Sequence, residues 1–143
     1  MINIALWCDH AGFEKKEILK QRFTEKKYWF TDYGCHSSES VDYPDFIHPV
    51  AKNISKKVCQ KGIVFCTTGN GSAMAANRHK GIRAALCWNQ EITSLARHHN
   101  DANILVIPAW YINQEMLFQM VDIFLETEFD GGRHERRICK IEI

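Results

Sequence analysis

Short apolar runs alternate with helical patterns along the whole of this chain. Five runs rich in β-branched and aromatic residues are typical of strands, at 2–8, 28–33, 62–65, 82–87 and 104–107. Helical patterns separate and follow them, at 11–27, 47–58, 89–99 and 116–125. Such alternation favours a parallel sheet covered by helices on both faces. We therefore expect a doubly wound α/β domain of the Rossmann or flavodoxin type, with a five-stranded parallel sheet in the order 2-1-3-4-5.

Length and composition agree with a single domain. The 143 residues are 45% hydrophobic, which is enough to bury a core, and no linker, repeat or low-complexity segment divides 1–143. The tail after Gly131 and Gly132 is rich in arginine. We expect it to form a short C-terminal helix from about residue 131.

The charge and the cysteines limit the possible functions. A formal net charge of +1 gives no reason to expect nucleic acid or an anionic membrane surface as a partner. No apolar stretch approaches the roughly 20 residues of a membrane span, and residues 1–8 lack the basic start of a signal peptide. The six cysteines include no CxxC pair, which is typical of reduced thiols. We expect a cytoplasmic protein.

The segment 62–76 is the most informative about chemistry. An apolar strand ends at Cys66, a Thr/Gly loop follows, and small residues then begin a helix. Backbone N–H groups of such a loop can hold an anion. The positive end of the helix dipole is expected to lower the pKa of Cys66. The pattern therefore predicts a polarised thiol beside an anion site.

Three known motifs do not fit this loop. A cysteine phosphatase needs Cys-x5-Arg, but Ser72 stands at the arginine position. A Walker A loop needs Gly-Lys-Ser/Thr, which is absent. A G-x-G-x-x-G dinucleotide fingerprint could start at Gly69, but Met74 stands where its third glycine is required. These mismatches favour a thiol that acts in acid–base chemistry.

Two polar clusters accompany the thiol. Asp9 and His10 follow the first strand, so they are expected to face Cys66 across the ends of neighbouring strands, although Asp9 could simply cap a helix and His10 could be a surface residue. His98 and His99 close a helix before the fifth strand, at the sheet edge opposite Cys66. They either cap that helix or act in the site of a second subunit.

The tail adds a third cluster. Arg133 and Arg137 lie four residues apart and face one side of a helix, where they either remain solvated or bind phosphate. No His, Cys and Asp spacing matches a known ligand set, so we expect no metal site.

Together these segments resemble the ribose-, galactose- and allose-phosphate isomerases, the family of type B ribose-5-phosphate isomerase. The matching segments span almost the whole chain in the family's order: 5–10 (ALWCDH), 42–44 (DYP), 66–71 (CTTGNG), 75–77 (AAN), 81–85 (GIRAA), 99–101 (HND) and 131–134 (GGRH). Two positions depart from the family pattern. Thr67 replaces a usual glycine, and Trp110 stands where many members have a phosphate-binding arginine.

The resemblance implies an aldose–ketose isomerase without a cofactor, active as a homodimer or tetramer with sites shared between subunits. The reaction would interconvert ribose 5-phosphate and ribulose 5-phosphate through a cis-enediolate. Its alternatives are a hexose 6-phosphate isomerase, a non-catalytic sugar-phosphate-binding subunit and a flavodoxin-like mononucleotide binder.

The resemblance also assigns roles to residues. Cys66 would be the base that takes the C2 proton, and His99 would help to open the sugar ring. The backbone of 67–71, namely Thr67, Thr68, Gly69, Asn70 and Gly71, would stabilise the enediolate oxygen. Thr68 and Asp9 would support the sugar hydroxyls and the ring oxygen, Asn100 would contact the enediolate region, and Tyr43 would line the pocket. The phosphate would be bound by His10, Arg133 and Arg137, with His134 nearby.

Overall fold

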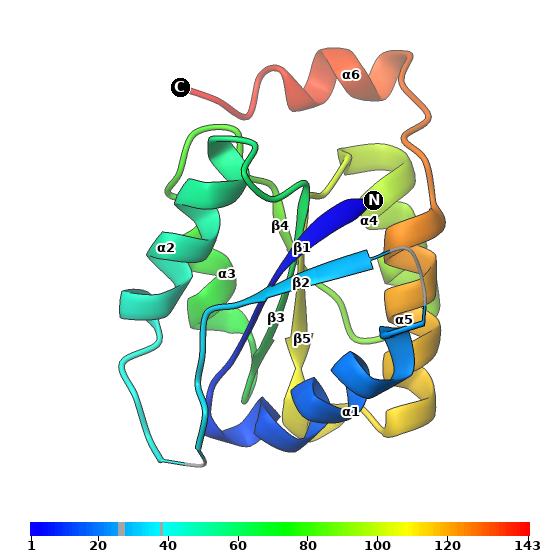
Figure 1. Cartoon of the computed structure of the whole chain (residues 1–143). Coiled ribbons are helices and arrows are strands. Elements are labelled where there is room, and N and C mark those ends of the chain that lie inside the picture. The colour runs from blue at the N-terminus through cyan, green and yellow to red at the C-terminus, as the bar shows by residue number, and fades with distance from the viewer. Residues whose placement is uncertain (26–27, 38) are drawn as a thin grey trace.

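The computed structural model describes residues 1–25, 28–37 and 39–143, which form a five-stranded, all-parallel sheet (Figure 1). Its spatial order is β2-β1-β3-β5-β4. The strands are β1 (Ile2–Cys8), β2 (Tyr28–Asp32), β3 (Lys61–Cys66), β4 (Ala84–Leu86) and β5 (Ile104–Pro108). The expected doubly wound α/β fold is confirmed.

Helices cover both faces of the sheet (Figure 1). One face is covered by α2 (Pro44–Ser55) and α3 (Asn70–Ala76), and the other by α1 (Phe13–Phe23), α4 (Gln90–Asn100) and α5 (Gln114–Glu126). Two 3-10 turns, η1 (His10–Gly12) and η2 (Ala109–Tyr111), follow β1 and β5, and α6 (Arg133–Ile138) ends the chain. The helix expected over 11–27 is shorter, and its last two positions, 26 and 27, lie outside the described residues.

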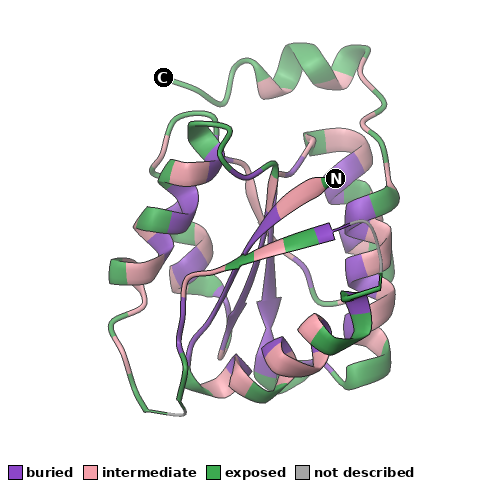
Figure 2. Cartoon of the chain, viewed as in Figure 1, coloured by how far each residue is buried: buried purple, intermediate pink, exposed green. Residues whose placement is uncertain are grey.

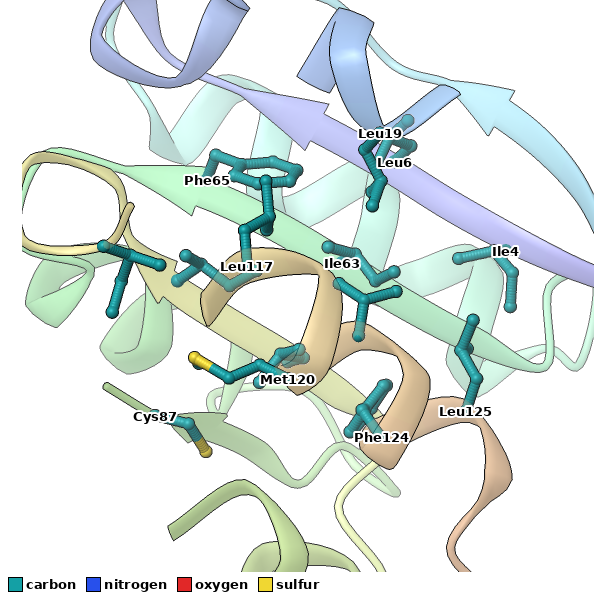
Figure 3. Packing of buried hydrophobic residues seen from close by; sticks show 14 of the residues in the cluster. Ile4, Leu6, Leu19, Ile63, Phe65, Cys87, Leu117, Met120, Phe124 and Leu125 are labelled. Atoms are coloured by element: carbon teal, nitrogen blue, oxygen red, sulfur yellow. The ribbon is translucent and has the colours of Figure 1, made fainter. Parts of the chain in front are cut away.

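Alternate residues of β1, β3 and β5 supply the two cores. Ile4 and Leu6 of β1 point into the core under α1 and α5, while Ala5 and Trp7 belong to the core under α2 and α3. Figure 3 shows the first of these cores, where α5 packs its apolar side against β1 and β3. Figure 2 shows the resulting pattern, with buried strands at the centre and an exposed α6. Because both of their faces are covered, these three strands are apolar on both sides.

The expected sheet order 2-1-3-4-5 is wrong, because β5 lies between β3 and β4. All five residues of β5 are buried, whereas the three residues of β4 are only partly buried. The more apolar strand thus takes the interior position, where both faces are covered. The shorter β4 becomes an edge, and the Asn77 side chain pairs with it by donating to the Ala84 carbonyl (2.9 Å) and accepting from its N–H (2.8 Å).

The two ends of the sheet differ in what surrounds them (Figure 1). At the carboxyl end, where the parallel strands finish, lie η1, η2 and the start of α3. At the amino end lie the last turn of α4 and the whole of α6, which packs against α4. Among the described residues, no helix is long and apolar enough to cross a membrane.

Candidate active site

Asp9 joins the ends of β1 and β3 at the carboxyl end of the sheet. Its backbone N–H donates to the Phe65 carbonyl at 3.0 Å. Oδ1 accepts from the N–H groups of Ala11 (2.9 Å) and Gly12 (3.2 Å), and Oδ2 accepts from the N–H (3.1 Å) and hydroxyl (3.3 Å) of Thr67. Asp9 is therefore an N-cap, and it also fixes the loop that follows Cys66.

Cys66 ends β3 beside this carboxylate and is 8% exposed. Burial raises the pKa of the Cys66 thiol, and the charge of Asp9 raises it further. The nearby Ser72 hydroxyl and the Thr67 backbone lower that pKa, but these contributions are smaller in sum. The expected lowering by the helix dipole is thus wrong in sign, because desolvation of a buried thiolate outweighs the donors that face it.

The loop after Cys66 depends on Gly69. Its φ of +81° is left-handed, and an added Cβ would lie 2.5 Å from Leu86 Cδ1 and 2.9 Å from Val106 Cγ1. Thr67 has no positive φ, so a threonine in place of the usual glycine fits without strain. Its N–H is committed to Asp9 and does not face the opening, in contrast to the expected role in binding an anion.

Tyr43, His10 and Trp110 surround the same loop. Tyr43 precedes α2, and its hydroxyl lies so close to Gly71 that any side chain there would clash with it. His10 is exposed on η1, next to Asp9. The backbone N–H of Trp110 donates to the Thr67 carbonyl at 3.4 Å, while the Trp110 residue is 67% exposed. The Trp110 backbone is therefore joined to the loop, at the position where many family members have an arginine.

The remaining predicted residues lie at the amino end of the sheet. His99 and Asn100 are in the last turn of α4, and the His99 ring stacks on His134 of α6 with centroids 4.3 Å apart. Arg133 and Arg137 are exposed, and within the described part of the chain neither has an ion pair. As expected, His99 is remote from Cys66. The two residues are separated along the strand direction, at opposite ends of the sheet, and not at opposite edges as the sequence suggested.

One group at this end has ligand atoms that could hold a metal ion. The side chains of His99, Asp130 and His134 place such atoms within 4.8 Å of one another, which their sequence spacing does not reveal. Partial desolvation, His99 and the cations of Arg133 and Arg137 all lower the pKa of His134. Positive charge so close to the group favours an anion over a cation. The sequence predicted no metal site, and the positive charge around this group gives no reason to propose one here.

Sequence reasoning missed Ser72 as part of the site. The residue is fully buried in the first turn of α3, and its hydroxyl has no hydrogen-bond partner within geometric limits among the described residues. The only available signal was a small polar residue six positions after Cys66. That signal is weak, since serine is common at the start of helices.

Comparison with known proteins decides the family. The model of the family described as Ribose/Galactose Isomerase matches residues 4–141. The chain belongs to this family. The resemblance inferred from the seven sequence segments is confirmed over almost the entire length.

Individual relatives are similar over their whole length. A ribose 5-phosphate isomerase from Thermotoga maritima is 50% identical, with a TM-score of 0.95 over 99% of this chain and 97% of that one. Ribose-5-phosphate isomerase B from Mycoplasma genitalium, solved with bound ribulose-5-phosphate, is 38% identical with a TM-score of 0.93 over 98% and 93%. Ribose-5-phosphate isomerase B of Escherichia coli is 36% identical over 96% and 93%.

Proposed function

We propose that this protein is an aldose–ketose isomerase that interconverts ribose 5-phosphate and ribulose 5-phosphate through a cis-enediolate. The observation that supports it most is the buried Cys66 thiol beside Asp9, at the carboxyl end of a sheet whose whole architecture matches ribose 5-phosphate isomerases. The relative with bound ribulose-5-phosphate supports a pentose phosphate as substrate. A panel of ribose, allose and galactose phosphates tests it, and turnover of hexoses alone would refute the pentose assignment.

In this proposal Cys66 is the base. Its thiolate takes the proton from C2 of the open-chain sugar, and the electron pair forms the C1–C2 double bond of the enediolate. The proton on O2 then passes to O1, and the thiol returns its proton to C1, so that C2 becomes the carbonyl carbon of the ketose. The donors left to stabilise the enediolate oxygen are the N–H groups of Thr68, Gly69 and Gly71, because the Thr67 N–H donates to Asp9 and the Asn70 N–H donates to the Thr68 hydroxyl. One such donor is typically worth about 10²–10³ in rate.

The amino end of the sheet supplies the other half of the proposed site. His99 opens the sugar ring and Asn100 contacts the sugar, while Arg133 and Arg137 hold the phosphate with His10 of the other half. Their exposed guanidinium groups suit a phosphate, which accepts paired N–H bonds. His134 supports His99 through their stacked rings. Thr68 and Tyr43 complete the pocket around Cys66.

Because the two halves lie at opposite ends of the sheet within one subunit, we propose a homodimer, or a tetramer of such dimers, with sites shared between subunits. Exposed apolar side chains on α3 and after β4, Met74 and Trp88, are consistent with a surface that a partner covers. No cofactor takes part in the proposed reaction. The six cysteines, all unpaired, support a cytoplasmic location.

Subunit mixing tests the shared site. Cys66→Ala and His99→Ala subunits are each expected to be inactive. After exchange, half of the dimers are mixed, each with one intact site, so about a quarter of the wild-type activity should return in a two-fold symmetric dimer. No recovery, with mixed dimers verified by mass spectrometry, would show that the site lies within one subunit.

A further inference from the structure

Ser72 has a buried hydroxyl that the fold leaves without a partner. The residue is 0% exposed, and its Oγ makes no hydrogen bond within geometric limits in the described part of the chain. An unpaired buried hydroxyl is unfavourable, and such groups are uncommon in folded proteins. Its place in the first turn of α3, just beyond the Cys66 loop, suggests that the hydroxyl has a partner at another stage of the reaction.

The nearest reacting group is the Cys66 thiol. The Ser72 side chain lies close enough to lower the pKa of Cys66, which is the effect expected of a hydroxyl that donates to sulfur. Asp9 has the opposite effect, because its negative carboxylate repels the thiolate and so favours the protonated thiol. The two neighbours therefore favour different protonation states of the same sulfur.

The elements around the thiol carry several other titratable groups. They include Cys8 at the end of β1, Asp9 and the exposed His10 at η1, and Tyr43 just before α2. β5 ends beside Cys66 at Pro108, which does not titrate. Asp9 is thus the charged group that opposes the thiolate, and Ser72 is the side-chain donor that faces it.

We propose that Ser72 is a positioning residue whose hydroxyl donates a hydrogen bond to the Cys66 thiolate and so holds the base ready for the C2 proton. This rests on the proposed role of Cys66 in isomerisation. When the thiolate takes the C2 proton, the S–H bond forms and the C2–H electron pair enters the enediolate, so the sulfur becomes the neutral thiol that the Asp9 charge favours. When the proton moves to C1, Ser72 again donates to the sulfur. The Ser72 hydroxyl keeps its own proton throughout.

Ser72→Ala tests this role by the rate of alkylation of Cys66 as a function of pH. Iodoacetamide labelling is followed by peptide mass spectrometry in a Cys139→Ser background, since Cys139 is the exposed cysteine. Loss of a hydrogen bond to a charged group should move the midpoint of Cys66 alkylation up by about one to two pH units. The rising limb of kcat/KM against pH should move by the same amount, with near wild-type rates at the alkaline end.

A matched control exists at Cys87. The Thr93 hydroxyl lowers the pKa of that thiol as Ser72 does for Cys66, but Cys87 is fully buried and has no role in the reaction. Thr93→Val should leave both Cys66 profiles in place. Ser72→Thr keeps the hydroxyl and should also leave the alkylation midpoint unchanged.

The outcomes separate the two proposals. An unchanged alkylation midpoint in Ser72→Ala, or a shifted one in Ser72→Thr, overturns the role of Ser72. A shifted midpoint in a protein that isomerises no sugar phosphate leaves the Ser72 contact standing and refutes the proposed function. A merely structural role predicts a lower melting temperature and a rate reduced equally at every pH. We expect Ser72→Ala to melt no lower than wild type, because the removed hydroxyl has no partner.

Discussion

Cys66 and Cys87 occupy equivalent places at the ends of β3 and β4, two strands separated by β5, yet only Cys66 belongs to the candidate site. Each follows or ends a parallel strand, each precedes a helix, and each has a hydroxyl residue six positions later. Burial raises the pKa of both thiols, that of Cys87 to about 11. The two loops therefore share a local design, and the difference between them lies in how their polar groups are satisfied.

The Cys87 loop is closed by its own side chains. Asn89 caps α4 by accepting from the Ile92 N–H at 2.9 Å, and the Thr93 hydroxyl donates to the Asn89 carbonyl at 2.7 Å. The Cys66 loop has neither feature, since Gly69 caps α3 without a side chain and Ser72 is unpaired. A loop that leaves donors unused is suited to a ligand, whereas a loop that satisfies them is suited to stability.

Replacing each thiol by alanine should separate the two loops most strongly. Cys66→Ala removes the proposed base and is expected to lower kcat by about 10²–10⁴-fold, as loss of a general base does. Cys87→Ala should keep kcat and cost about 1 kcal/mol of unfolding free energy for the lost packing. Steady-state assays and urea denaturation measure both, and comparable losses of kcat in the two variants would contradict the comparison.

Gly69 is the second point at which the loops differ. Gly69→Ala combines a left-handed backbone with overlap on Leu86 and Val106, so the unfolding free energy should fall by about 2–4 kcal/mol. Gly81→Ala is the control, because Gly81 has a φ of +78° and nothing within 4 Å of an added Cβ. It should lose only about 1–2 kcal/mol. Equal losses on urea denaturation would mean that close contact at Gly69 is unimportant.

Because both pKa values are raised, activity should increase with pH through Cys66, whereas stability should decrease with pH through Cys87. The rate requires the Cys66 thiolate, so kcat/KM should increase about tenfold per pH unit below the raised pKa of Cys66. Cys87 is held protonated in the fold, so its contribution to stability is present below its ordinary pKa and declines as the pH rises towards 11. A flat rate profile between pH 7 and about 9 would show that Cys66 is not the base.

The smallest expected effect concerns the cap of α4. Asn89→Ala removes the hydrogen bond to the Ile92 N–H and should lower the unfolding free energy by about 1 kcal/mol, with kcat unchanged. Thermal denaturation measures the loss of stability, and an activity assay checks that kcat is unchanged. A marked loss of activity would mean that the Cys87 loop also takes part in the reaction.

Local patterns predicted much of the fold. β1 has the predicted bounds, and the other four strands lie at or within about two residues of theirs, because alternation and β-branched runs are local properties. The order of β4 and β5 was predicted wrongly, since it depends on which strand best tolerates cover on both faces. That choice is global, and it became clear only from the burial of all five β5 residues.

The candidate site divides in the same way. Asp9 and Cys66 were expected to lie together because parallel neighbours end at one edge, and the Asp9 bonds to Phe65 and Thr67 agree. The sign of the Cys66 pKa shift was not predictable from the helix dipole, because it depends on burial by residues distant in sequence. Ser72 was missed for a related reason, since serine at a helix start gives no sign of lacking a partner.

The sequence by itself determined the α/β class, the family and the chemical character of the loop after Cys66, because periodicity and motif spacing act over short ranges. The tertiary structure decided which groups meet, such as Thr67 with Asp9 and His99 with His134, and that the Ser72 hydroxyl is buried without a partner. It also placed these groups at two opposite ends of one sheet (Figure 1). Each of these contacts depends on strand order and burial, which arise only when the whole chain packs.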